Sequence, residues 1–86
     1  MQFDGALIKE QGVTFAIGVV KPYVINNSLE SQSARIVFGR YFPGVPIVLM
    51  AQPSGGRPVY QGRTDIVNFL SRISPSRIPW KTYSAA

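Results

Sequence analysis

The stretch of residues 13–20, VTFAIGVV, narrows the possible folds of this chain more than any other. Its β-branched and aromatic residues favour a strand, and both of its alternating faces are apolar. A strand of this kind is covered on both sides in the folded protein. Lys21-Pro22 ends it, because proline has no N–H to donate to a neighbouring strand. We therefore expect residues 13–20 to form a central strand of a sheet.

A second strand precedes this segment, and a helix follows it. Residues 3–8, FDGALI, end on three apolar residues and lead into residues 9–12, KEQG, which are typical of a tight turn between two strands. Downstream, the side chain of Asn27 can cap a helix, and Glu30 three residues later completes an approximate capping box. We expect this helix to end before residues 43–44, PG, because proline and glycine interrupt helices.

The second half of the chain has the pattern of a hairpin. Residues 45–51, VPIVLMA, favour a strand, and residues 59–61, VYQ, favour a short second one. Between them, residues 52–58, QPSGGRP, are dense in turn-forming residues. The two strands should therefore pair with each other.

A last helix follows the hairpin. Residues 62–65, GRTD, open it, and Asp65 lies in the first turn, where the helix dipole favours a negative charge. Ser74-Pro75 closes it. We expect the tail, residues 76–86, to be irregular and held in place by its aromatic side chains.

Helical spacing predicts which helical side chains face the core. In the first helix an apolar stripe runs from Leu29 to Tyr41, and in the last helix it runs from Ile66 to Ile73. We expect five residues of these stripes to be mostly buried: Ile36, Val37, Ile66, Leu70 and Ile73.

The order of elements predicts one small α+β domain, residues 1–86, with a four-stranded mixed sheet and two helices packed on it in two layers (ββαββα). A chain of 86 residues is too short for two cores. A domain of this size buries a limited share of its surface, so we also expect a homodimer or weaker self-association.

Three segments resemble the C-terminal half of a thioredoxin-like fold: residues 41–50, YFPGVPIVLM, residues 59–63, VYQGR, and residues 65–70, DIVNFL. In that family a strand begins just after a proline held in cis, pairs in a hairpin with the next strand, and a glycine leads into the last helix. Pro46 occupies the place of that proline. The resemblance covers about residues 42–73 and implies the fold of that half.

Residue types that are absent exclude several activities. The chain has no Cys and no His, so it has no thiol chemistry, and serine triads and transition-metal sites lack their usual groups. Residues 20–23, VKPY, stand where the thioredoxin-like family carries its dithiol, and no redox activity is carried over. The acids are Asp4, Glu10, Glu30 and Asp65, and no pair has a catalytic spacing. We expect no enzymatic activity, no cofactor and no metal.

The charge balance is basic: nine Lys and Arg against four acids, a formal net charge of +5. No two basic residues are adjacent, but several lie in the C-terminal third beside aromatic residues. The candidate binding surface consists of Arg57, Tyr60, Arg63, Arg72, Arg77, Trp80, Lys81 and Tyr83. Cations interleaved with aromatics are typical of single-stranded nucleic-acid sites, and the same set is also typical of a solvated face with aromatics that close the core.

Two functions follow from this surface. The leading hypothesis is a non-enzymatic binding or adaptor domain that recognises a protein partner or its own copy through an apolar surface with the tail aromatics. Trp80 would serve as the anchor, or would pack the tail onto the core. The alternative is a nucleic-acid-binding protein that uses the basic and aromatic set.

The N-terminus lacks the pattern of a secretory signal, and no apolar stretch approaches the length of a membrane span, so we expect a cytoplasmic protein without a membrane partner.

Overall fold

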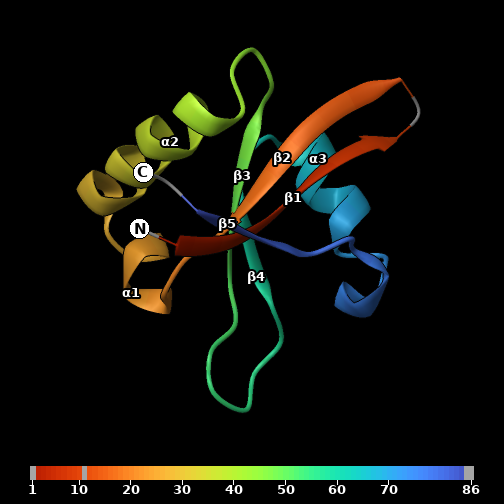
Figure 1. Ribbon diagram of the computed structural model, residues 1–86. Helices are drawn as coiled ribbons and strands as arrows, with labels where there is room; N and C mark the ends of the chain where they lie inside the picture. Colours follow the sequence, from red (N-terminus) through yellow and green to blue (C-terminus); the bar gives the residue numbers. More distant parts are fainter. Residues whose placement is uncertain (1, 11, 85–86) are drawn as a thin grey trace.

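A five-stranded mixed sheet runs through the middle of the molecule in the computed structural model, which describes residues 2–10 and 12–84 (Figure 1). The described elements, in chain order, are β1 (Gln2–Glu10), β2 (Val13–Val19), α1 (Pro22–Ile25), α2 (Ser28–Tyr41), β3 (Ile47–Ala51), β4 (Val59–Gln61), α3 (Thr64–Leu70), the 3₁₀ helix η1 (Pro75–Arg77) and β5 (Lys81–Ser84).

The strands lie in the order β4-β3-β2-β1-β5, so β2 is central, as predicted. The neighbours β1 and β2 form an antiparallel hairpin, and β3 and β4 form another. Between the hairpins, β2 and β3 are parallel, and the chain crosses from one to the other through α1 and α2. A parallel pair requires such a crossover, because a tight turn cannot join two strands that run in the same direction.

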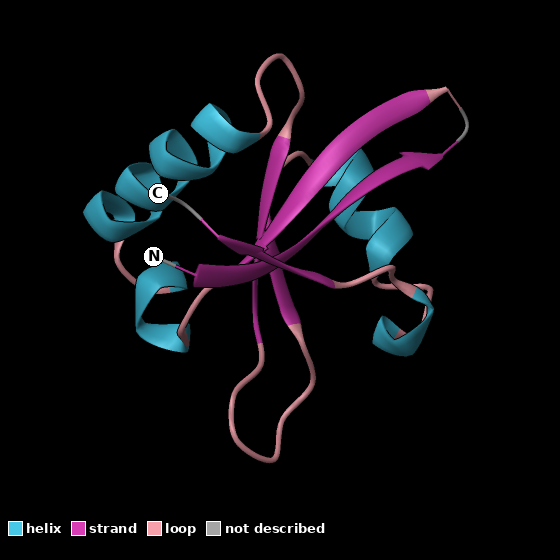
Figure 2. Cartoon of the chain, viewed as in Figure 1, coloured by secondary structure: helices cyan, strands magenta, loops and turns pink. Residues whose placement is uncertain are grey.

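Helices lie on both faces of the sheet (Figure 2). On one face α2 packs over a cluster of Phe3, Ala16, Phe38, Phe42 and Leu49. On the other face α3 packs over a cluster of Ala6, Phe15, Ile17, Val48, Met50, Ile66, Leu70 and Ile78. Successive residues of β2 alternate between these two clusters, which confirms the prediction that this strand is covered on both sides.

The small α+β domain with a mixed sheet is confirmed, but the counts of strands and helices are corrected. The tail is not irregular, because Lys81–Ser84 forms a fifth strand, β5, antiparallel to β1. Among the described residues there are three α-helices rather than two, since Pro22 begins the short helix α1 directly after β2. Proline at the first position of a helix sacrifices no hydrogen bond, so Pro22 both ends the strand and starts a helix.

The core-facing stripes are partly confirmed. Ile66 and Leu70 are buried, and Ile73 and Val37 are half-buried. Ile36 is 61% exposed, so the predicted stripe of α2 is wrong at this residue. The side chains that α2 buries are Ser31 and Phe38.

Two further expectations concern the peptide bond of Pro46 and membrane-spanning segments. None of the peptide bonds in the described residues is cis, so Pro46 is trans and lacks the isomer that the thioredoxin-like resemblance implies. Over the same residues, no helix has the length and apolar character needed to cross a membrane.

Candidate functional site

The structure divides the eight predicted binding residues among several places. Trp80, Lys81 and Tyr83 line one groove. Arg57 and Tyr60 line a pocket near the opposite edge of the sheet. The remaining three residues, Arg63, Arg72 and Arg77, are exposed and line neither hollow.

The groove lies where β5 separates from β1. The pairing of β5 with β1 covers residues 2–5 of β1 and stops at Gly5 opposite Lys81. Figure 1 shows the two strands running apart beyond this point. In the described part of the chain, residues 6–10 of β1 pair with β2 alone, and no strand lies on their outer side. We call residues 6–10 the open β1 edge.

Local hydrogen bonds hold the chain away from this edge. The backbone N–H of Trp80 donates to the carbonyl of Ile78 at 2.8 Å, and the indole Nε1–H donates to the carbonyl of Pro75 at 2.9 Å. Trp80 also packs against the cluster under α3. Since one hydrogen bond holds its backbone and another holds its indole, Trp80 forms a rigid wall of the groove.

The groove has a volume of about 480 Å³ and is lined by Leu7, Pro79, Trp80, Lys81 and Tyr83. Leu7 is 51% exposed, although it is a large apolar side chain on a strand. The ring of Tyr83 stacks on Phe3 with centroids 5.2 Å apart, so it is a fixed surface as well. An apolar groove beside an unpaired strand edge is suited to an extended peptide that adds a strand and inserts an apolar side chain.

The second hollow, near β4, has a volume of about 330 Å³. Its lining consists of Arg57, Pro58, Tyr60, Leu70, Ser71, Ile73 and Pro75. The hydroxyl of Tyr60 is buried and has no hydrogen-bond partner among the described residues. Burial raises the pKa of Tyr60, so the phenol is neutral and remains a donor at physiological pH.

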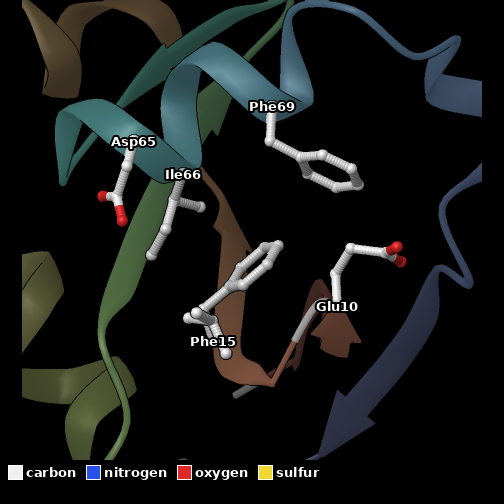
Figure 3. A pocket seen from close by; sticks show the side chains of 6 residues that line it. Glu10, Phe15, Asp65, Ile66 and Phe69 are labelled. Carbon is white, nitrogen blue, oxygen red and sulfur yellow. The ribbon is translucent and has the colours of Figure 1, made fainter.

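A third pocket, of about 150 Å³, contains two of the four acids (Figure 3). Glu10 comes from the end of β1 and Asp65 from the first turn of α3. Figure 3 shows their carboxylates on opposite sides of the pocket, pointing away from each other, with the rings of Phe15 and Phe69 between them. They therefore do not form a carboxylate pair. Within residues 2–10 and 12–84, no group of three or more acidic side chains is placed to hold a metal ion.

Asp65 is also engaged elsewhere. Arg63 donates two hydrogen bonds to its carboxylate, from Nε at 2.8 Å and from an Nη atom at 2.7 Å. These bonds lower the pKa of Asp65 to about 2 and raise the pKa of Arg63. The cation at position 63 is thus neutralised, which removes it from the free positive charge of the surface.

Sequence reasoning missed the role of Arg35, which lies among the scattered basic residues with no local pattern to mark it. Its guanidinium donates to the carbonyl of Ile47 at 2.6 Å, and to the carbonyl and the side-chain oxygen of Gln61 at 2.7 and 3.0 Å. The amide of Gln61 in turn donates to the carbonyl of Ile25 at 3.2 Å. Burial lowers the pKa of Arg35. This network connects α1, α2, β3 and β4.

No protein-family model, no curated protein and no solved structure matches the chain. The arrangement of the side chains and the strand edges therefore carries the functional argument.

Proposed function

We propose that this chain is a non-enzymatic protein-binding domain that adds an extended segment of a partner to its open β1 edge. One observation carries the proposal: β5 pairs with residues 2–5 of β1, whereas residues 6–10 have no strand on their outer side within the described chain. Unpaired N–H and C=O groups along a strand edge provide affinity for an extended peptide, and adjacent pockets provide specificity. The exposed side chain of Leu7 and the wall of Trp80 provide such a pocket.

Charge favours an acidic partner over a second copy. The lining of the groove contains one charged residue, Lys81, whereas on the open β1 edge the exposed Lys9 is followed by the exposed acid Glu10. The chain has a formal net charge of +5, so two copies repel each other at low ionic strength while an acidic segment is attracted. We therefore propose a partner segment in which apolar and acidic residues alternate.

A library of random 12-residue peptides displayed on phage tests this proposal. Selected peptides should alternate apolar and acidic residues and lack proline, which cannot pair along a strand. Upon binding, the alternate amide protons of residues 6–10 that point away from β2 should exchange more slowly with solvent. A library that yields no binder, or binders that protect other amides, would refute strand addition at this edge.

Two exposed leucines provide a matched pair of variants. Leu7→Asp places a negative charge in the groove and should weaken the selected peptides by more than tenfold, because it removes the apolar anchor and repels acidic residues. Leu29→Asp introduces the same charge on α2, where Leu29 is 74% exposed, and should leave binding unchanged. Equal effects of the two substitutions would place the binding surface elsewhere.

The nucleic-acid alternative stays a prediction, and no contact specifically favours it. Two of its aromatic residues, Trp80 and Tyr83, already pack against the protein, and Arg63 is paired with Asp65. The salt dependence of binding separates the two functions. Log affinity for a single strand falls with log salt with a slope of about 0.7 for each phosphate contacted, whereas a partner segment held by backbone hydrogen bonds, an apolar anchor and few charge contacts has a smaller slope.

The likeness to a thioredoxin-like fold also stays a proposal. Residues 42–73 contain β3, β4 and α3 in the order that the resemblance implies, which supports a shared arrangement of this half. We propose no shared activity on this ground, because fold alone does not determine function.

A further inference from the structure

The pocket beside β4 combines features that the proposed strand addition does not use. It lies near the opposite edge of the sheet from the groove, since β4 and β5 are the two outermost strands. Tyr60 pairs with Met50 of β3, and its side chain packs against the cluster under α3. The buried side chain of Leu70, at the end of α3, forms part of the same wall.

The hydroxyl of Tyr60 is the first sign of a ligand. Among the described residues it is the one buried side-chain polar atom that lacks a hydrogen-bond partner. Buried polar groups in folded proteins are nearly always paired, so an exception calls for a physical reason. A ligand atom that accepts a hydrogen bond within the pocket would supply the partner that the chain does not.

The charge of the pocket lining is the second sign of a ligand. Arg57 is the one charged residue that lines the pocket, and no acid lines it. Most of the remaining lining is apolar: Pro58, Leu70, Ile73 and Pro75. A volume of about 330 Å³ lies at the lower end of the range of small-molecule sites. Such a site accommodates one apolar group and one anionic group.

We propose that this pocket binds a carboxylate attached to an apolar group. Arg57 supplies the positive charge for the carboxylate, and the hydroxyl of Tyr60 donates to an acceptor oxygen of the ligand. The apolar group packs against Ile73 and Pro75, in front of the buried side chain of Leu70. A single guanidinium matches the one charge and planar shape of a carboxylate, whereas a phosphate-binding site gathers several donors and cations.

A carboxylate attached to an apolar group occurs in two sources: a free organic acid, and the C-terminus of a peptide with an apolar last residue. Methyl NMR spectra of Leu and Ile side chains test both sources. One arm uses 4-phenylbutyrate and its neutral counterpart 4-phenylbutanol. The other arm uses the dipeptide acetyl-Leu-Phe with a free or an amidated C-terminus. We expect saturable shifts of the Leu70 and Ile73 methyl signals with the charged member of at least one pair, and at least about tenfold weaker binding of its neutral member.

Two substitutions identify the groups that hold the ligand. Tyr60→Phe removes the hydroxyl and keeps the ring, so binding should weaken by about tenfold or more while the protein remains at least as resistant to urea as before. Arg57→Gln should weaken binding to a similar extent. The control is Arg72→Gln, which removes an exposed charge that does not line the pocket and should leave binding unchanged.

Three outcomes would overturn the proposal: no saturable shift with either acid at 20 mM, equal binding of both neutral counterparts, or unchanged binding in both the Tyr60→Phe and Arg57→Gln variants. The result does not depend on strand addition at the open β1 edge. Leu7→Asp should leave the methyl shifts intact, so failure of one site is distinguishable from failure of the other.

Discussion

The ring of Phe38 lies in the space that a side chain at position 18 would need. A Cβ atom built on Gly18 would lie 2.5 Å from Cδ2 and 2.7 Å from Cζ of Phe38, closer than real carbon atoms approach. Because Gly18 has no side chain, α2 can place this ring directly on β2, where it also packs against Phe3 with centroids 4.8 Å apart. This contact determines which side of α2 faces the sheet.

Gly18→Ala should therefore destabilise the fold. The added methyl group would push the Phe38 ring off β2, and overpacking of a core costs about 1–3 kcal/mol. Urea unfolding, followed by the fluorescence of the single tryptophan, measures the loss. A second substitution, Phe38→Leu, should recover part of this loss in the Gly18→Ala background, because the smaller side chain makes room for the methyl group.

Gly39→Ala is the control for this contact. Gly39 also lies on α2, but an added Cβ atom would meet nothing within 4 Å. Alanine should stabilise the helix here by up to about 1 kcal/mol, because glycine is a poor helix former. A loss of stability in both variants would show that the contact with Phe38 is not the cause.

The side of α2 that faces the sheet could not be predicted from hydrophobic spacing alone. Leu29 and Ile36 share one face of the helix by spacing and are exposed, whereas Ser31 on another face is buried. The hydroxyl of Ser31 donates to the carbonyl of Val24 at 2.6 Å, which makes a polar residue suitable for burial. The start of the helix was predictable, since Asn27 caps the N–H groups of Leu29 and Glu30 as its position indicates.

The tail was mispredicted for a different reason. The pairing of β5 with β1 joins Ser84 to Gln2 and Tyr83 to Phe3, across almost the whole chain. Local sequence patterns contain no information about such a pairing, and a strand of four residues, KTYS, has one apolar member. The aromatic tail residues Trp80 and Tyr83 line one groove with Leu7, and this grouping depends on the long-range register.

Arg35→Lys should destabilise the fold although it keeps the charge. A lysine ammonium lacks the planar fork that reaches the carbonyls of both Ile47 and Gln61, so at least one of them loses its partner. Hydrogen bonds to charged groups contribute about 1.5–3 kcal/mol each, and we expect a loss of about 2 kcal/mol in urea unfolding. Arg40→Lys, an exposed residue on the same helix, should change stability by less than about 0.5 kcal/mol. Equal effects at both positions would contradict a specific role for Arg35.

The pair of Arg63 and Asp65 should make stability depend on pH in the acid range. The folded chain holds the pKa of Asp65 at about 2 through the hydrogen bonds from Arg63, below the value of roughly 4 for an unfolded aspartate. Between about pH 2 and pH 4 the unfolded state binds more protons than the folded state. The contribution of this pair to the free energy of unfolding is therefore present above about pH 4 and is lost as pH falls toward 2. Asp65→Asn should remove this part of the dependence of Tm on pH. Both side chains are more than half exposed, so the effect should be small and weaken with salt. A variant with the same acid-range slope as the native chain would show that Asp65 does not contribute.

Self-association should respond to salt in the opposite direction to the binding of an acidic peptide. A second copy can pair only by bringing two chains of net charge +5 together, and salt screens this repulsion. Sedimentation at micromolar concentration should therefore show more dimer at 0.5 M than at 0.05 M salt, while an acidic strand should bind less tightly as salt rises.

Leu7→Asp should reduce the dimer if two open β1 edges pair. Trp80→Ala should reduce it as well and should also lower stability, because the indole packs on the core and donates to Pro75. A single species of 9.5 kDa at both salt concentrations would exclude self-association in this range and leave the edge to a different partner.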